Sequence, residues 1–280
     1  MFCFYPRGYV NGSGVINETE LWNDCTNNAL KNFLTFANII DFKFCVMIVN
    51  DILYTDVQME SLMSYIASNF FTKSSYLKMN GEPIVGIYSN SVNNDVEGLM
   101  PNGCHCKVIS NVPNLLHANG RMWYAGKHKN EPFGEHGYKS LLDENYNSIS
   151  GYMTSSTDEI VCVPVVAGWD DRARHDFANN FDDSTYRSYG KPTKEEFYKA
   201  LTDAIDLASW AGGQDTTILI YAWNEFGEGG YLPPTYGDTA DVANDYPAGN
   251  NEYFDFYKLE AVSDAREYWD AKANSVITRE

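Results

Sequence analysis

The stretch TTILIYAWNEFGEGG, residues 216–230, carries the clearest fold signal in this 280-residue chain. Its first eight residues are all β-branched, aromatic or aliphatic, a composition typical of a buried strand. The strand pattern ends directly in asparagine, two glutamates and three glycines around one phenylalanine. Polar groups in this place are informative, because the carboxyl ends of parallel strands and the loops after them build the ligand sites of α/β barrels.

Similar strand patterns recur along the chain and alternate with helical ones. Short apolar, β-branched or aromatic runs bounded by turn residues predict seven strands, at residues 2–6, 42–49, 83–88, 106–109, 148–153, 160–166 and 217–223. A shorter run at 122–125 is an additional candidate. Apolar residues spaced three and four apart predict helices at residues 20–40, 57–71, 194–210 and about 252–273.

This alternation predicts an α/β protein whose parallel strands are joined by helical crossovers. Because 44% of the residues are hydrophobic and no linker divides the chain, we expect residues 1–280 to form one domain, a (β/α)8 TIM barrel. A closed barrel needs eight strands, yet the first run begins at residue 2 with no helix before it. Either the run at 122–125 completes the ring, or this chain lacks the first strand and helix of the barrel. In the second case the strand near residue 2 pairs with the strand near residue 45 and has an open edge on its other side.

Composition narrows the range of partners. Acidic residues outnumber basic ones by 38 to 20, and a net charge of −18 repels nucleic acid and anionic membrane surfaces. The chain has no apolar stretch of about 18 residues, so no membrane span is expected. The first residues lack the features of a signal peptide, and the compartment stays open. Four of the six cysteines lie in or beside apolar runs and are expected to be buried thiols: Cys3, Cys45, Cys106 and Cys162.

Glu225 and Glu228 are the candidate catalytic residues. They follow the strongest strand at a spacing of three, and the glycines at 227, 229 and 230 allow sharp turns that can bring both carboxyl groups to one side of the loop. Hydrolysis of a glycosidic bond needs such a pair, one carboxyl protonated near the leaving oxygen and one ionised. Two glutamates of an acidic chain can equally be loop residues without a catalytic role, and composition alone leaves both interpretations open.

The segment AWNEFGEGGYLPPT, residues 222–235, resembles the signature of WbsX-like proteins and of glycoside hydrolase family 99. This sequence has Phe226 where that signature has tryptophan and Pro233 where it has glutamate. Other segments resemble the same group in the same order along nearly the whole chain: residues 2–5 with 11–12, 50–51, 79–85 and 164–170.

This resemblance implies a TIM barrel and a retaining, endo-acting α-mannosidase. It implies that Glu225 deprotonates the sugar 2-hydroxyl to give an anhydro-sugar intermediate, while Glu228 is the general acid and then the base. In the more usual retaining scheme one carboxylate attacks the anomeric carbon, and the sequence does not choose between the two schemes. Two alternatives stay open, a WbsX-like glycosyltransferase of polysaccharide biosynthesis and a catalytically silent glycan-binding barrel. Against the transferase, the chain has no glycine-rich loop or evident DxD site for a nucleotide sugar.

Residues near other predicted strand ends are candidate ligands of an oligosaccharide or polysaccharide substrate. Aromatic rings can stack on sugars and charged groups can bind hydroxyls, although an Asp/Arg pair can also simply close a loop. The candidates are Tyr5, Asn50, Asp51, Tyr88, Trp169, Asp170, Arg174, Trp223, Asn224 and Tyr231. No metal or other cofactor is expected, because Cys104-His105-Cys106 lacks the second ligand pair of a zinc site and the other histidines are scattered.

Overall fold

The computed structural model divides the chain into two compact units. The first comprises Met1–Met122 and Asp158–Val161, and the second Trp123–Thr157 and Cys162–Glu280; we describe each by itself. The structure describes residues 1–6, 9–36, 42–50, 54–89, 100–101, 104–111, 118–122, 134–143, 146, 150, 160–170, 187–210, 215–225, 230–233 and 256–277.

Parallel strands form the centre of the first unit. Each strand is parallel to the next, in the order β1 (Phe2–Phe4), β2 (Val46–Asn50), β4 (Glu82–Ser89), β5 (Lys107–Ser110) and β6 (Gly120–Arg121). Ile160 and Val161, the start of β8 (Ile160–Val166), follow β6, also in parallel; the rest of β8 belongs to the second unit, where β11 (Asp215–Tyr221) is its neighbour. The predicted pairing of the strands near residues 2 and 45 is confirmed. Among the described strands, β1 and β11 are the two ends of this order, so β1 has the predicted open edge.

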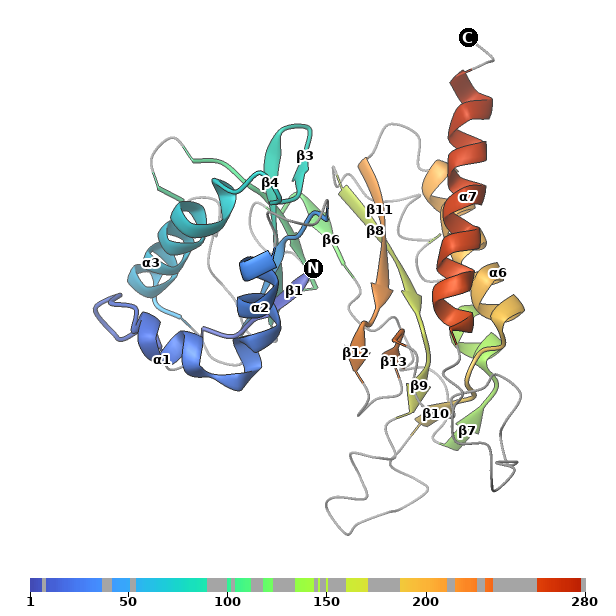
Figure 1. The fold of residues 1–280 in the computed structure, drawn as a ribbon, viewed down its shortest axis with the longest axis horizontal. Coiled ribbons are helices and arrows are strands. Elements are labelled where there is room, and N and C mark those ends of the chain that lie inside the picture. The colour runs from blue at the N-terminus through green and yellow to red at the C-terminus, as the bar shows by residue number, and fades with distance from the viewer. Residues whose placement is uncertain are drawn as a thin grey trace. The chain divides into compact units, whose positions relative to one another are not determined.

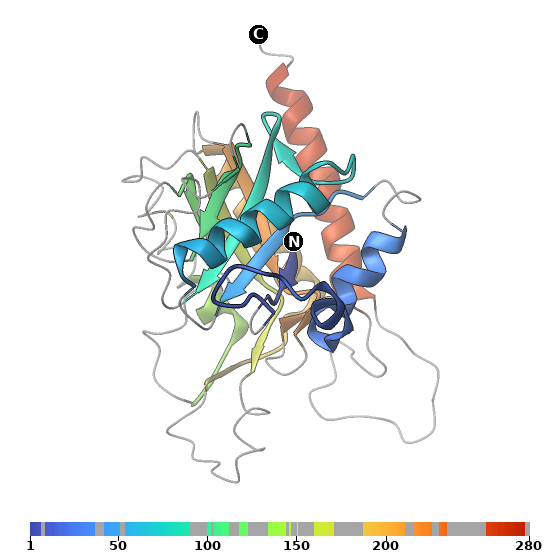
Figure 2. The ribbon, with the colours of Figure 1, turned by 90° about the vertical axis from the view of Figure 1, so that its left-hand side faces the viewer.

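Helix α3 (Asp56–Ile66) covers the strands of the first unit (Figure 2). It begins with a capping box, in which the Thr55 side chain accepts from the Gln58 backbone and the Gln58 side chain accepts from the Thr55 backbone. Its buried face consists of Met59, Leu62, Met63 and Ile66. A π-helical turn, Ala67–Phe71, continues the helix to the end predicted from the sequence.

Five aromatic rings pack together beside this helix. We call Phe4, Trp22, Phe44, Phe70 and Tyr76 the aromatic cluster, in which ring centroids of contacting pairs lie 5.1 to 6.3 Å apart. The Tyr76 hydroxyl also donates to the Ile84 carbonyl at 2.7 Å, which ties the cluster to β4. Edge-to-face packing of this kind adds to the stabilisation from burial alone.

The helix predicted over residues 20–40 is wrong as a single element. The chain forms α1 (Glu18–Asn23), a 3-10 turn (Cys25–Asn27) and α2 (Asn28–Phe36) instead. Asp24 has extended backbone, and its side chain accepts from the Thr26 N–H. Short polar side chains compete for backbone groups in this way, and they interrupt the helix that the apolar spacing indicated.

Two helices and two strands form the main part of the second unit. Every residue of β8 from Ile160 to Val166 is buried, as its apolar sequence predicted. Helix α6 (Lys194–Trp210) has the predicted bounds, and Glu196 and Thr193 form its capping box. Helix α7 (Tyr257–Ile277) lies alongside α6 (Figure 1). No helix of the described residues is long and apolar enough to cross a bilayer.

Several short strands were not predicted. Strand β3 (Lys78–Met79) forms a hairpin with β4 through Asn80 and Gly81, both at positive φ, and an Asn-Gly pair is typical of such two-residue turns. The others form small sheets of the second unit: β7 (Gly134–His136), β9 (Trp169–Asp170), β10 (Arg187–Tyr189), β12 (Asn224–Glu225) and β13 (Gly230–Tyr231).

Two predicted strands are mostly outside the described residues. Of 148–153 only Ser150 is described, and it is helical. Of 122–125 only Met122 is described, and it directly follows β6. Among the cysteines, Cys45, Cys106 and Cys162 are buried thiols as predicted, whereas Cys3 is half-buried.

Candidate active site

Strand β11 leads into the hairpin that contains Glu225. The peptide bond between Tyr221 and Ala222 is cis, and the Trp223 that follows is 60% exposed. Strands β12 and β13 then pair antiparallel, with Asn224 opposite Tyr231 and Glu225 opposite Gly230. Residues 226–229 connect them and lie outside the described residues, so Glu228 does too.

The hairpin is bound closely to the end of β11. The Ala222 N–H donates to the Gly230 carbonyl at 2.9 Å, and the Leu232 N–H donates to the Trp223 carbonyl at 3.2 Å. A Cβ on Gly230 would lie only 2.5 Å from the Tyr221 ring. This glycine is therefore required by close packing, whereas the sequence had pointed only to backbone freedom.

The end of β8 lies next to the end of β11. The Ala167 N–H donates to the Tyr221 carbonyl at 2.7 Å, and Gly168 then turns the chain at φ 146°, a conformation that favours glycine. The Trp169 ring that follows is 8% exposed and lies 6.1 Å from the Tyr221 ring. Asp170 is half-buried and pairs with Ser188 of β10. A sugar-stacking role for Trp169 stays a prediction.

A buried tyrosine also fixes the end of β8. The Tyr138 hydroxyl donates to the Val166 carbonyl at 2.6 Å. Burial raises the pKa of Tyr138 well above its ordinary value, so the hydroxyl stays protonated and keeps donating at any physiological pH. This hydrogen bond anchors the helical segment 138–143 to the last residue of the strand.

Lys258 is a component of this region that sequence reasoning missed. It lies in the first turn of α7 and is 3% exposed. Its Nζ donates to the Tyr231 carbonyl at 2.8 Å and lies 4.1 Å from the centroid of the Tyr231 ring. No local motif could have indicated this contact, because its two partners lie on separate elements of the sequence.

The first unit brings three further predicted residues to one sheet edge. Tyr5 follows β1, Asn50 is the last residue of β2, and Tyr88 is opposite Val49 near the end of β4. The Tyr5 backbone is held by Asn27, whose Oδ1 accepts from the Tyr5 N–H at 3.0 Å and whose Nδ2 donates to the Tyr5 carbonyl at 3.1 Å. The structure therefore places these residues at carboxyl strand ends, as predicted, whereas Asp51 and Arg174 lie outside the described residues.

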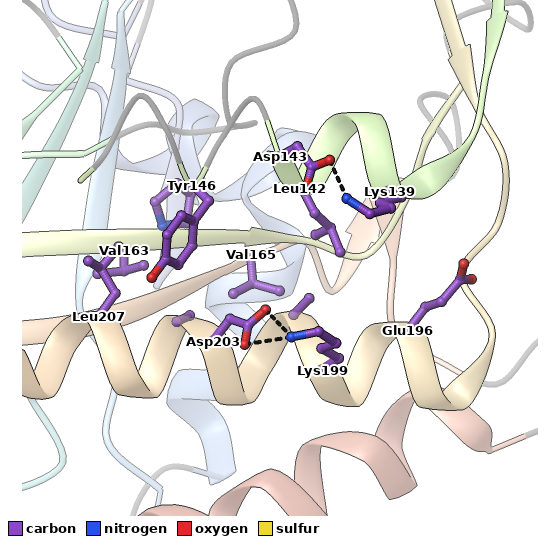
Figure 3. Close-up of a pocket in the computed structure, with 13 residues that line it drawn as sticks. Lys139, Leu142, Asp143, Tyr146, Val163, Val165, Glu196, Lys199, Asp203 and Leu207 are labelled. Carbon is purple, nitrogen blue, oxygen red and sulfur yellow. Dashed lines mark hydrogen bonds and ion pairs between the residues drawn. The ribbon is translucent and has the colours of Figure 1, made fainter. Parts of the chain in front are cut away.

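The second unit also has a pocket of about 480 Å³ that is lined by residues of β8 and α6 (Figure 3). Val163 and Val165 of β8 line it, together with apolar side chains of α6 and of the segment 138–143. Its charged side chains already have partners: Lys139 pairs with Asp143, Lys199 pairs with Asp203, and Glu196 caps α6. We do not assign the chemistry to this pocket, because barrel enzymes build their active sites at the carboxyl ends of the strands and in the loops that follow them, whereas Val163 and Val165 lie inside β8.

The structure thus defines an α/β protein with parallel strands, in which a hairpin that contains Glu225 directly follows β11. A family model described as "Glycosyltransferase WbsX" matches residues 124–240, which include the hairpin. Among curated proteins no match was found.

Solved structures with a similar fold include two of the GH99 endo-α-mannosidase from Bacteroides thetaiotaomicron. One, in complex with BIS-TRIS-propane, is 14% identical with a TM-score of 0.55, and the alignment covers 90% of this chain and 78% of that one. The other is 15% identical with a TM-score of 0.54, and the alignment covers 88% and 73%. The predicted resemblance and the predicted α/β, TIM-barrel-like fold are confirmed.

Proposed function

We propose that this protein is a retaining glycoside hydrolase that cleaves O-glycosidic bonds in mannose-containing or related glycans. The observation that carries the proposal is the position of Glu225, on a hairpin directly after β11 in a TIM-barrel-like fold. Barrel enzymes draw their catalytic groups from such strand ends. The similar solved structures of an endo-α-mannosidase support this choice of reaction.

The proposed mechanism divides the work between two carboxyl groups. Glu225, as the ionised partner, deprotonates the sugar 2-hydroxyl, whose oxygen then displaces the leaving group from the anomeric carbon. Glu228, as the protonated partner, gives its proton to the departing oxygen. In the second step Glu228 takes a proton from the water that attacks the anomeric carbon, while Glu225 returns its proton to the 2-oxygen as the anhydro bond breaks. Different surroundings that push the two pKa values apart would suit these opposite tasks.

Each unit, taken by itself, has candidate residues for sugar binding. The 60% exposed Trp223 next to Glu225 offers a ring on which a sugar can stack. For the second unit we propose sugar binding by the remaining candidates: Trp169, Asp170, Arg174, Asn224 and Tyr231. In the first unit the assigned residues are Tyr5, Asn50, Asp51 and Tyr88, whose hydroxyl, amide and carboxylate groups can hydrogen-bond to sugar hydroxyls.

Release of oligosaccharides from a panel of α-mannans and bacterial polysaccharides tests this function. We expect the purified protein to generate new reducing ends on at least one of them, and Glu225→Gln and Glu228→Gln to abolish this activity. Glu267→Gln, at an exposed position of α7, is the matched control and should retain it. A protein that releases nothing from any glycan, while still binding one, would instead be a silent glycan-binding barrel.

The description of the matching family favours a second candidate, transfer of a sugar to a growing polysaccharide. A transferase would consume an activated donor, so it would release nucleotide from a nucleotide sugar in the presence of an acceptor glycan. Release of nucleotide without hydrolysis of any glycan would replace the first proposal by this one.

A further inference from the structure

Lys258 is a buried cation on the element that follows the candidate active site. Only 3% of it is exposed, and removing an ammonium group from water is costly unless its hydrogens find acceptors. Lys258 Nζ donates a hydrogen bond to the Tyr231 carbonyl oxygen at 2.8 Å, and the ammonium group lies 4.1 Å from the centroid of the Tyr231 ring. Lys258 therefore holds both the backbone and the side chain of Tyr231.

Tyr231 connects this cation to Glu225. It is paired with Asn224 across the hairpin, and Gly230 beside it is paired with Glu225. Each of these strands has two residues, which is too short to be stable without outside support. Displacement of Tyr231 would therefore move the backbone on which Glu225 sits.

We propose that Lys258 is a positioning residue, whose ammonium group fixes the β12–β13 hairpin and thereby the place of Glu225. A hydrogen bond from a charged donor is about twice as strong as a neutral one. The cation–π contact with Tyr231 adds to it in a dry environment. The proposal rests on the proposed function only in that Glu225 is the group whose position matters.

Lys272, on the same helix, provides the matched control. It also lies over a tyrosine ring, that of Tyr268 at 5.9 Å, and it pairs with Asp206 on α6. It is 272 − 258 = 14 residues further along α7, about 21 Å at the rise of an α-helix. Lys258→Met and Lys272→Met thus make the same chemical change at the two ends of one helix.

Hydrogen–deuterium exchange of the full chain tests the positioning directly. In Lys258→Met, peptides that contain the amides of Ala222 and Leu232 should exchange about tenfold faster or more, as expected when a charge-assisted hydrogen bond to a locally opening segment is lost. Lys258→Arg keeps the charge and should show a smaller increase, and Lys272→Met should leave these peptides unchanged. Parent-like exchange in folded Lys258→Met, or an equal increase in Lys272→Met, would overturn the proposal.

Circular dichroism establishes whether Lys258→Met folds. If it does not, Lys258→Arg and Tyr231→Leu carry the test, because the second removes the ring while leaving the lysine in place. Faster exchange of the hairpin peptides in Tyr231→Leu supports the proposal, and unchanged exchange in both variants contradicts it.

Kinetics separate positioning from substrate binding. On a glycan that the parent cleaves, Lys258→Met should lower kcat by about tenfold or more with KM nearly constant, because a misplaced catalytic group slows the chemical step. A raised KM with unchanged kcat would make Lys258 a binding residue and contradict positioning. If the parent cleaves no glycan, only the proposed function fails, since the exchange result decides the role of Lys258 by itself.

Discussion

The two units support their strand ends in different ways. In the first unit, β1, β2 and β4 form a continuous parallel ladder, and the aromatic cluster lies beside it. In the second, the end of β11 runs into a short hairpin that depends on Gly230 against Tyr221 and on Lys258 against Tyr231. The difference teaches that support in the first unit is spread over many contacts, whereas the candidate site depends on a few. We therefore expect substitutions in the first unit to lower stability and substitutions at the hairpin to lower activity more than stability.

The largest stability effect is expected in the aromatic cluster. Phe44 is 1% exposed and its ring contacts those of Phe33, Phe70 and Tyr76. Phe44→Ala leaves a cavity and should lower the free energy of unfolding by about 3–5 kcal/mol. Denaturant unfolding measures this, with the 57% exposed Phe36→Ala as control. A loss below about 1 kcal/mol would show that the cluster does not support the unit.

Gly230→Ala should affect the hairpin most. Its new methyl group would lie 2.5 Å from a Tyr221 ring atom and 3.2 Å from the Gly168 carbonyl oxygen. Overpacking of this kind costs about 1–3 kcal/mol, and the ring or the hairpin must shift. We expect the rate of glycan cleavage to fall by more than the loss of folded protein accounts for. Gly137→Ala, which meets no atom within 4 Å, is the control, and equal behaviour of the two variants would refute the packing argument.

Asn27→Ala tests how strongly a single buried side chain of the first unit contributes to stability. This buried side chain bonds to both backbone groups of Tyr5 and donates to the Leu21 carbonyl at 3.1 Å. Its removal leaves these groups without those bonds and should cost about 1–2 kcal/mol. Thermal unfolding of this variant beside the exposed Asn69→Ala gives the difference. A fully stable Asn27→Ala would mean that water replaces the side chain at no cost.

The smallest effect is expected at the start of α6. Thr193 accepts from the Glu196 N–H at 3.1 Å, and its own N–H donates to the Glu196 carboxylate at 2.9 Å. Loss of such a cap typically costs about 1 kcal/mol, so Thr193→Ala should be destabilised by that amount while Thr193→Ser is not. Equal denaturation midpoints of the two variants would show that the cap does not stabilise the helix.

Local patterns predicted the regular parts of the fold well. Strand β8 and helix α6 have the predicted bounds, because continuous burial and a clear helical period leave little ambiguity. The break at Asp24 was not predicted, since it depends on a polar side chain that takes over backbone hydrogen bonds, among them that of Thr26. Periodicity of apolar residues does not report such competition.

The position of the candidate site was predictable from the sequence, but the contacts that hold the site were not. The strand-to-glycine transition after residue 223 indicated where Glu225 lies, and the structure puts it on a hairpin there. Besides the Tyr221 ring, what holds that hairpin comes from elsewhere in the sequence: the Gly168 turn and Lys258. Contacts between elements distant in sequence leave no local signal, and the roles of Glu225 and Glu228 themselves stay predictions.

The most direct test of the central claim compares the two glutamates on substrates with poor and activated leaving groups. Glu228→Gln should lose about 10²- to 10⁴-fold in rate on a natural glycan and recover much of it on an activated substrate, which needs no protonation. Glu225→Gln should not recover, because its task is to activate the 2-hydroxyl. Near-parental turnover by both variants on a glycan that the parent cleaves would contradict the assignment and leave the aspartates around Trp169 as the next candidates, among them Asp170 of β9.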